Sequence, residues 1–331
     1  MRNFKVIIAN NAAALRLENP THTVEAEYGL DVVEGSVLTL AHHGPRVGNP
    51  CPCLGDSIPY EGTEPIVIGV SHFDLDTLGG VLRIVGQKYS FERLFWKVAA
   101  LVDTMGVHKL EEIREILIAE TYPGSPESPR DGYWFGYDYG GGVVPALNMF
   151  WAWSEDHRLF APRDGSVLDC TEFFGEALQV LQLMLYGDIY DAGYSELAFR
   201  AKEWVEAKEA LDTASKRFAW GEDPSYEDCA VILREADCFT NHLYNNMGRV
   251  FHAVVGFNTQ YKSVTLSLGN PVDGINCCEI AQQLWGPEAG GHAGIAGSPR
   301  GKEMGMDAAH EAARTMVAAL RGVSVEAVGY V

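Results

Sequence analysis

The feature that most constrains the fold is a series of short apolar runs in the first half of the chain, three of which end directly in polar or glycine-containing residues. The runs occupy residues 4–9, 36–41, 65–70 and 98–103. Continuous apolar strands that end in polar loops are typical of a buried parallel sheet, whose ligands bind at the carboxyl ends of the strands. We therefore predict an α/β fold in which the loops after three of these runs gather at one edge of the sheet.

The rest of the chain follows other patterns. Apolar residues recur at intervals of three and four over residues 171–216, which predicts helices. Further strands are predicted over 228–235, 249–257 and 262–268, with helices over 277–285 and 308–322. A length of 331 residues suits about two domains. The predicted organisation is a mainly parallel-sheet metal-binding domain (1–165), a helical connector (166–222) and a smaller C-terminal α/β substrate-binding domain (223–331), with the active cleft between the two domains.

Composition limits the classes of partner. The net charge is −20, and such an acidic surface repels the backbone of a long nucleic acid. A small phosphorylated ligand remains compatible, because a metal ion or a few arginines can reverse the field locally. We find neither a secretory signal nor the ~18–20 apolar residues of a membrane span, and therefore expect a cytoplasmic protein without a membrane partner. A homodimer is compatible with the sequence.

The seven cysteines do not suggest a disulfide framework, because their number is odd and the chain is long. Cys51 and Cys53 form a Cys-Pro-Cys segment. It is interpreted either as part of a proline-rich turn or as half of a soft-metal site, for which no second ligand pair at zinc-site spacing is found.

The segment SHFDLDTLGG follows the apolar run 65–70. His72, Asp74 and Asp76 alternate in it, and in an extended strand end their side chains would share one face. Two carboxylates and an imidazole suit Mn²⁺ or Mg²⁺. The alternative is that the two aspartates are solvated turn residues or helix caps.

Two further segments supply histidines and an acid. His42 and His43 follow the run 36–41 and would face different ways, so that one could bind metal and the other substrate, while Arg46 could hold a phosphate oxygen. Asp103 would end a strand, where it could bridge two metal ions or cap the following helix. The alternative for the histidines is a pair of turn residues.

Near the C-terminus, WGPEAGGHAGIAGSPRG (285–301) is rich in glycine. Gly290 and Gly291 would allow a ligand to approach the backbone, whose N–H groups could face an anion. His292 adds a donor, and Arg300 lies just beyond. The alternative is a tight turn between a helix and a strand.

Together these segments resemble the DHH phosphoesterase superfamily. The most specific match is VTLSLGNPVDGINCCEIAQQLWGPEAGGHAGIAG (264–297), which is similar to the family's associated C-terminal domain with its GGGH motif. SHFDLDTLGG looks like the family's His-x-Asp-x-Asp motif and AHHG like its namesake DHH. Three features differ: AHHG precedes the metal motif, which a circular permutation would explain, Ala41 replaces the first Asp, and Gly269 replaces an Arg.

The resemblance implies hydrolysis of a phosphodiester, phosphomonoester or phosphoanhydride at two divalent ions, usually Mn²⁺, with Mg²⁺ as an alternative. The substrate would be a small phosphorylated molecule such as a nucleotide or short oligonucleotide. The implied roles, by position, are metal binding by His42, His72, Asp74, Asp76 and Asp103; catalysis by Asp76, Asp103 and His43; and substrate binding by Arg46, Gly290, Gly291, His292 and Arg300.

Two other classes are weighed against this hypothesis. SHFDLDTLGG superficially resembles the metal motif of metallo-β-lactamase-like hydrolases, but Asp74 and Thr77 stand where histidines are expected. A non-catalytic nucleotide sensor on the same fold is the second alternative, because Ala41 and Gly269 replace residues that a phosphoesterase of the family would use.

Overall fold

The structure is a computed structural model. It describes residues 3–322 other than 30, 34–35, 60–61, 63–64, 87–92, 122–127, 137–140, 215–217, 220–229 and 247–248. The chain forms two compact units. The first comprises Met1–Glu27, Val32–His42 and Arg46–Lys208, and the second comprises Tyr28–Asp31, His43–Pro45 and Glu209–Val331. Within the described part of the chain, no helix is long and apolar enough to cross a membrane.

The first unit is built on a five-stranded sheet of order β5-β2-β6-β1-β7. Its strands are β1 (Phe4–Ile8), β2 (His22–Val24), β5 (Leu38–Leu40), β6 (Ile66–Val70) and β7 (Leu168–Asp169). The first four run parallel and β7 is antiparallel to β1. The sheet carries apolar side chains on both faces, as the uninterrupted apolar runs require. The predicted α/β class with a mainly parallel first sheet is therefore confirmed.

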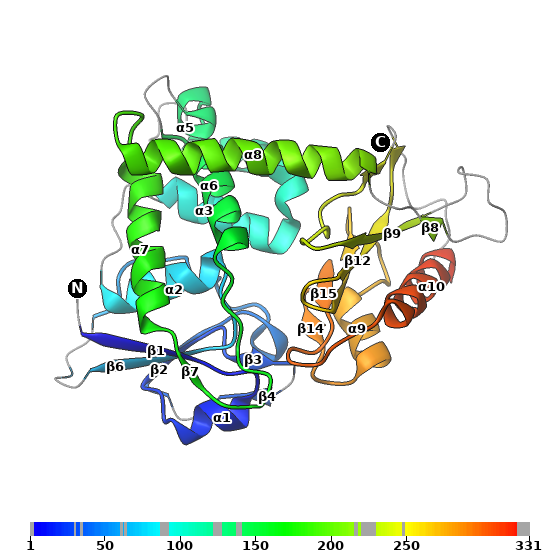
Figure 1. The fold of residues 1–331 in the computed structure, drawn as a ribbon, viewed down its shortest axis with the longest axis horizontal. Coiled ribbons are helices and arrows are strands. Elements are labelled where there is room, and N and C mark those ends of the chain that lie inside the picture. Colours follow the sequence, from blue (N-terminus) through cyan, green and yellow to red (C-terminus); the bar gives the residue numbers. More distant parts are fainter. Residues whose placement is uncertain are drawn as a thin grey trace. The chain divides into compact units, whose positions relative to one another are not determined.

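Helices cover both faces of this sheet (Figure 1). Helices α2 (Leu75–Val85), α3 (Arg93–Met105), α6 (Val143–Asp156) and α7 (Thr171–Tyr186) share one apolar core with β1 and β6. On the opposite face, Leu15 of α1 (Ala12–Leu17) lies against Gly69 of β6, where a side chain at position 69 would contact it. The remaining helices are α4 (Leu110–Glu120), α5 (Asp131–Phe135) and α8 (Ala192–Ala214).

Strand register places three chain segments beside one another. Val24, the last residue of β2, pairs with Leu40 at the end of β5 and with Val70 at the end of β6. Parallel strands that end in register send their following residues to the same sheet edge. Residues 25–27, 41–43 and 71–74 therefore all begin at this edge, and they contain the candidate ligands of the first unit.

One of the predicted strands is wrong. Residues 98–103 lie within helix α3, and Asp103 stands in its last turn rather than at a strand end. The run is too short to separate a buried strand from a buried helix by periodicity. Two features favour the helix: the alanines of the run are strong helix formers, and Leu94 and Phe95, which precede the run, form a buried apolar face together with Val98. Asp103 thus reaches the sheet edge from a covering helix.

Helix α2 contains a glycine pair that the packing requires. A β-carbon on Gly79 would lie 2.4 Å from Cβ of Cys53 and 2.7 Å from the ring of Trp96. A β-carbon on Gly80 would lie 2.5 Å from Cγ1 of Val24. Glycine within a helix costs about 1 kcal/mol relative to alanine. This cost is offset by the close approach of the 51–53 turn and of β2 to the helix.

We expect Gly79→Ala to destabilise the protein by about 1–3 kcal/mol, because the new methyl group overpacks a region that cannot yield. Gly175 of α7 provides the matched control, since a β-carbon there would meet nothing within 4 Å. Gly175→Ala should leave stability unchanged or raise it by up to about 1 kcal/mol. Chemical denaturation of the two variants measures both effects, and equal stabilities would contradict this account of the glycine pair.

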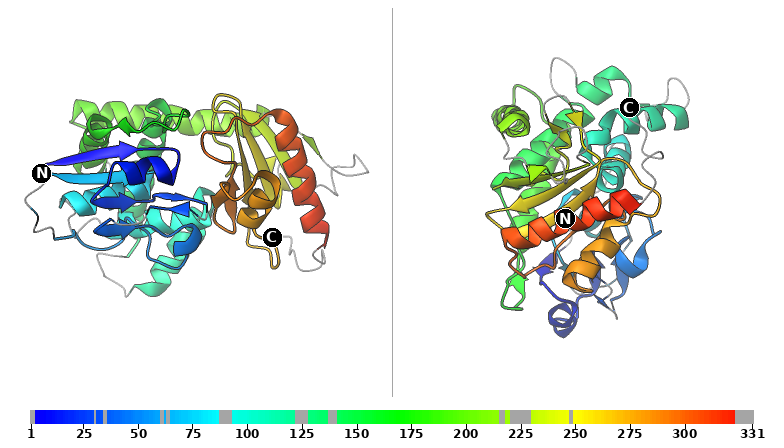
Figure 2. Two further views of the ribbon diagram at one scale, coloured as in Figure 1. Left: turned by 90° about the horizontal axis from the view of Figure 1, so that it is seen from below. Right: turned by 90° about the vertical axis from the view of Figure 1, so that its right-hand side faces the viewer.

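The second unit has a six-stranded sheet of order β14-β15-β13-β12-β9-β8. Its main strands are β9 (Val231–Ala236), β12 (Ala253–Asn258) and β13 (Ser263–Leu268); the shorter ones are β8 (Phe218–Ala219), β14 (Gly290–Gly291) and β15 (Ile295–Gly297). Helices α9 (Cys277–Trp285) and α10 (Met306–Gly322) pack on one face of the sheet, as Figure 2 shows. The helices predicted for this region are present, and so is the strand predicted over 262–268. The strand predicted over 249–257 is instead divided into two, Arg249–Val250 and Ala253–Asn258, and residues 228–229 of the first predicted strand lie outside the described residues.

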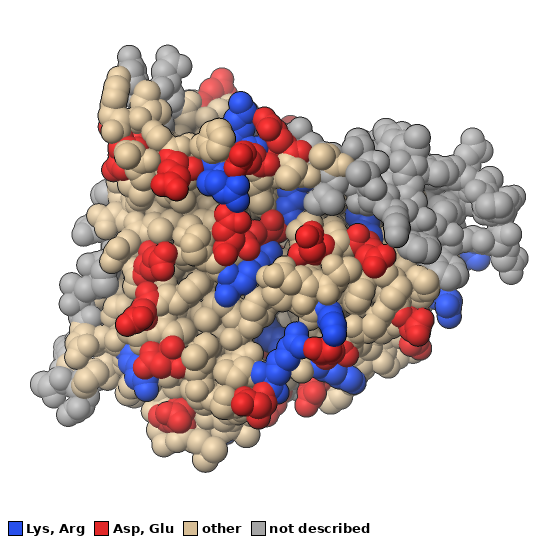
Figure 3. Space-filling model, in the orientation of Figure 1, with Lys and Arg blue, Asp and Glu red and all other residues tan. Residues whose placement is uncertain are grey.

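Short strands complete the structure: β3 (Glu27–Tyr28) pairs with β4 (Asp31–Val32), and β10 (Asn245–Asn246) with β11 (Arg249–Val250). Charged residues of both signs are interspersed on the face shown in Figure 3. On α8, Arg200 forms ion pairs with Asp156 and Glu203.

Candidate metal centre

Glu25 lies at the end of β2 in an unusual backbone conformation. Its φ is 47°, and its side chain is fully buried. Non-glycine residues adopt this left-handed region only at a cost of about 1–3 kcal/mol, so the surroundings must hold it there. The Glu25 N–H donates to the carbonyl of Leu40 at 2.9 Å, and its carbonyl accepts a hydrogen bond from the hydroxyl of Ser71. Glu25 is thereby fixed between the two neighbouring strand ends.

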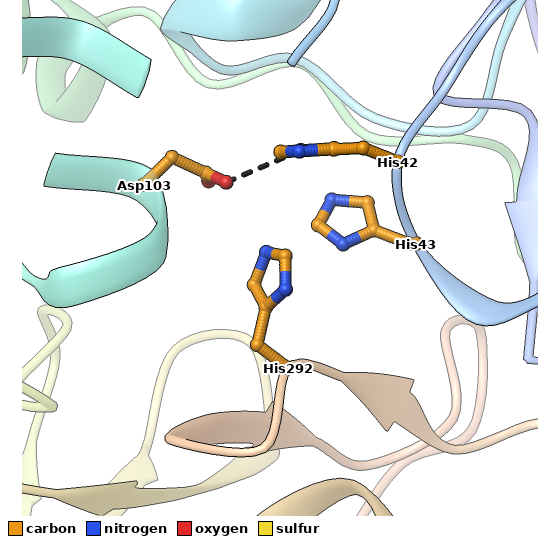
Figure 4. Close-up of side chains that lie close together, drawn as sticks. All are labelled: His42, His43, Asp103 and His292. Carbon is orange, nitrogen blue, oxygen red and sulfur yellow. Dashed lines mark ion pairs between the residues drawn. The ribbon is translucent and has the colours of Figure 1, made fainter. Parts of the chain in front are cut away.

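His42, two residues after β5, is surrounded by acidic side chains of its own unit. Its Nε2 lies 3.2 Å from Oδ2 of Asp103, an ion pair drawn in Figure 4, and 3.4 Å from Oδ2 of Asp76. Oε1 of Glu25 is 3.7 Å from the same nitrogen and accepts a hydrogen bond from the backbone N–H of His42 at 3.2 Å. The His42 side chain is 5% exposed. One imidazole thus faces carboxylates from three separate elements.

Three aspartates form a second overlapping group. Carboxylate oxygens of Asp74, Asp76 and Asp103, one from each residue, lie within 4.8 Å of one another. Asp74 is the N-cap of α2, and its side chain accepts the N–H of Thr77 at 3.0 Å. Asp76 lies in the first turn of α2 and is 2% exposed. The extended strand end that was expected to align His72, Asp74 and Asp76 is therefore wrong beyond Val70, because α2 begins at residue 75.

Crowding of acids alters their protonation. Burial, followed by the negative charges of Asp74 and Asp103, raises the pKa of Asp76 well above its ordinary value. Burial, followed by the charge of Glu27, raises the pKa of Glu25 to about 10. Both effects penalise the charged form. A cation between these groups would remove the penalty by supplying the opposite charge.

Asp74 behaves differently from its neighbour. Burial opposes its ionisation, but the adjacent His72 and hydrogen bonds from Asp76 and Thr77 hold the pKa of Asp74 well below its ordinary value. Nε2 of His72 lies 2.6 Å from Oδ2 of Asp74. His72 is therefore engaged with a carboxylate. The pKa values of the two aspartates are therefore shifted in opposite directions, because His72 lies against Asp74 while Asp76 faces further acids.

Arg46, considered above as a phosphate ligand, forms an ion pair with Glu27. Its Nη1 lies 2.5 Å from Oε1 of Glu27, whose side chain is 4% exposed. The arginine therefore neutralises a buried acid of its own unit. A phosphate that used Arg46 would have to share it with this carboxylate or replace it.

In the second unit, His43 and His292 are neighbours. Their ring centroids lie 4.2 Å apart at 55°, and Figure 4 shows the two rings side by side. Gly290 and Gly291 form β14, which pairs with β15 as a tight hairpin. A β-carbon on Gly291, with φ 144°, would lie 2.4 Å from the carbonyl oxygen of Ile295. The N–H of His292 also donates to Ile295, at 2.6 Å.

Gly291 therefore has a structural reason to be glycine. The backbone N–H of His292 is committed to the hairpin, while its imidazole projects toward His43. Arg300 follows β15 and is exposed. The backbone N–H of His292 is therefore not available to the anion site that the sequence predicts at this loop.

Sequence reasoning missed Glu25 and Glu27. The strand that precedes them, β2, has only three residues, two of them His22 and Thr23, so no apolar run marks it. The sequence does contain a signal: in VEAEYG two acids separated by one residue follow Val24, and SHFDLD contains the same spacing of two acids. Because β2 pairs in register with β6, the segments that follow these two strands begin at the same edge of the sheet.

The donor set of the first unit fits a divalent cation. Buried His, Asp and Glu side chains are grouped closely enough that they could hold a metal ion. Ligand atoms bound to one ion at ~2.1 Å lie about 3 Å apart, close to the 3.2 and 3.4 Å that separate His42 from Asp103 and Asp76.

A scan of protein-family models finds no match to the chain, and a search of curated proteins finds none either.

Proposed function

We propose that the first unit binds divalent cations, Mn²⁺ or Mg²⁺, and that the protein hydrolyses a small phosphorylated molecule. The observation that carries the proposal is the position of His42, whose Nε2 lies within 3.7 Å of carboxylate oxygens of Asp103, Asp76 and Glu25. Without a metal, burial disfavours the ionised forms of these acids, so they contribute little to the stability of the fold. A bound cation would stabilise the ionised forms, which is why such a group suits a cation site.

The residues divide into two roles under this proposal. His42, Asp76 and Asp103 hold the cation directly, and Asp74 completes the acidic group. A bound divalent cation supplies a Lewis acid that lowers the pKa of a water molecule and neutralises charge on a phosphoryl group. His72 orients Asp74 through the 2.6 Å contact, as partners of metal-binding carboxylates generally do. Glu25 fixes His42 through its backbone N–H.

Two further groups are candidates for the substrate. His43 and His292 present two imidazoles within the second unit, and neutral or protonated imidazoles donate hydrogen bonds to phosphate oxygens. Arg300 is an exposed cation near the same hairpin. The resemblance to the DHH superfamily implies that this segment binds the phosphate of the substrate. The proposed substrates are nucleotides, short oligonucleotides and other small phosphate esters or anhydrides.

The test is turnover of a generic phosphodiester and of a short oligonucleotide by the purified protein. We expect hydrolysis with Mn²⁺, none with a chelator, and a loss of about 100-fold or more in Asp103→Asn, which removes a charged ligand while keeping its shape. Asp164→Asn is the matched control, since Asp164 is exposed and its contacts are with Ser166. Equal rates with and without metal would contradict the proposal. Nucleotide binding without any turnover would instead support a sensor.

A further inference from the structure

The Cys-Pro-Cys turn lies beside the acidic group. Sγ of Cys51 and Sγ of Cys53 are 3.3 Å apart, and the two residues are 5% and 0% exposed. The Cys51 thiol also donates to Oδ2 of Asp76 at 3.8 Å. Sγ of Cys53 lies 3.7 Å from the carbonyl oxygen of Trp96 in α3. Two thiols are thus in contact with each other, and one of them contacts the carboxylate proposed to hold the cation.

The turn is held in this place by helix α2. Gly79 provides the space for Cys53, and Gly80 lies where a β-carbon would be 3.0 Å from Pro52. Arg83 donates to the carbonyl of Pro52 at 2.8 Å and to that of Asp56 at 3.1 Å. Three positions of α2 therefore accommodate or anchor the turn. The position of the turn that brings the two sulfurs together is therefore set by its packing against α2.

We propose that Cys51 and Cys53 are an oxidisable pair, which a peroxide converts into an intrachain disulfide, and that this modification weakens cation binding at Asp76. The second half of the proposal rests on the proposed function, because it assumes that Asp76 binds the cation. The first half concerns the thiols alone.

The chemistry balances with hydrogen peroxide as the oxidant. One sulfur attacks a peroxide oxygen, the O–O bond breaks, and a sulfenic acid and one water form. The second sulfur then displaces the hydroxyl group, forming the S–S bond and releasing the second water. The two thiols lose two hydrogens and two electrons, which the peroxide accepts. Peroxide is small, and Cys51 retains 5% exposure at the turn.

The disulfide would change the environment of Asp76 in two ways. Cys51 loses its hydrogen, so it no longer donates to Oδ2 of Asp76. The sulfurs must also close from 3.3 Å to a bond of about 2.05 Å, which displaces the turn against a helix that cannot yield at Gly79. Loss of a hydrogen-bond partner of a metal ligand typically costs about 10–100-fold in metal affinity.

The sequence makes the disulfide easy to detect. Trypsin releases residues 47–83 as one peptide, which contains Cys51 and Cys53 and no other cysteine. After peroxide treatment of the native full-length protein, we expect this peptide to lose the mass of two hydrogens and to regain it with dithiothreitol. We expect Mn²⁺ affinity, measured by calorimetry on the same samples, to fall about tenfold or more and to recover on reduction.

Two variants separate the effects. Cys53→Ser keeps the Cys51 thiol beside Asp76 and cannot form the bond, so its Mn²⁺ affinity should be unaffected by peroxide. Cys170→Ser removes another buried cysteine and should respond as the wild-type chain does. The mass of peptide 47–83 is measured on the wild-type protein, so this test of the disulfide remains valid even if a variant does not fold.

The outcomes distinguish the two proposals. An unchanged mass of peptide 47–83 after peroxide would overturn the oxidisable pair. A complete disulfide with unchanged Mn²⁺ affinity would overturn the coupling to Asp76. A reduced protein that binds no Mn²⁺ would contradict the proposed function and with it the coupling, while the peptide mass would still decide whether the cysteines form the bond.

Discussion

Asp76→Asn should make the metal-free protein more stable and should weaken its binding of Mn²⁺. In the folded protein burial and two neighbouring acids raise the pKa of Asp76, which means that its surroundings disfavour the ionised form. Asparagine keeps the shape and removes the charge. We expect the free energy of unfolding of the metal-free protein to rise by about 1–3 kcal/mol, the usual cost of an unfavourable buried polar group. Mn²⁺ affinity should fall by about 100-fold or more, since a charged ligand is lost.

Chemical denaturation followed by tryptophan fluorescence, with and without Mn²⁺, measures both halves of this result. Metal that binds only the folded state stabilises it in proportion to its affinity. The wild-type protein should therefore gain stability from Mn²⁺, and the variant should gain none. Asp164→Asn removes the same charge from an exposed position and should leave the Mn²⁺ response intact. A variant that is less stable without metal would contradict the interpretation of Asp76 as an unfavourable buried acid.

The stability of the metal-free protein should also fall as the pH rises. The pKa of Glu25 is raised from 4.5 to about 10 on folding, so between these values the folded state binds more protons than the unfolded state. The stabilising contribution is complete below pH 4.5 and is lost progressively toward pH 10. One proton gives a slope of about 1.4 kcal/mol per pH unit at most. Mn²⁺ binding should strengthen over the same window, because the cation displaces these protons.

Glu25→Gln tests the assignment, because the amide keeps the hydrogen bond from the His42 backbone and cannot titrate. Its metal-free stability should vary less with pH than that of the wild-type chain over pH 5–9, a span about four units wide inside the window. Unfolding curves across that range, at constant ionic strength, give the two slopes. If the slopes coincide, the pH dependence arises from other groups and the environment assigned to Glu25 is wrong.

Much of the fold could be predicted from the sequence, because the most deeply buried strands and helices carry apolar patterns long enough to recognise. β1, β6, α9 and α10 each carry such a pattern. α9 is also marked by its cap, since Asn276 accepts the N–H groups of Cys278 and Glu279. Failures occurred where a run is short or compatible with two periodicities, as in β2 and in residues 98–103 of α3.

The candidate site was only partly accessible for a related reason. His42, Asp76 and Asp103 carry local signals, because each follows or closes an apolar run. Glu25 reaches the group through strand order and a left-handed backbone, neither of which leaves a sequence pattern. The engagement of Arg46 by Glu27 and of His72 by Asp74 depends on tertiary contacts. The residue types predicted which side chains could bind metal or phosphate. The tertiary contacts determine which of these side chains already form ion pairs within the protein.

The division of the chain has a consequence for its biosynthesis. Tyr28–Asp31 and His43–Pro45 belong to the second unit, whose remaining residues begin at Glu209. Gly29 packs against the backbone of Pro287, where an added β-carbon would lie 1.8 Å from the carbonyl oxygen. On the ribosome these early segments are made long before their contacts exist. The second unit can thus be completed only after the residues from Glu209 onward have been made, and a fragment starting at residue 209 would lack two segments of that unit.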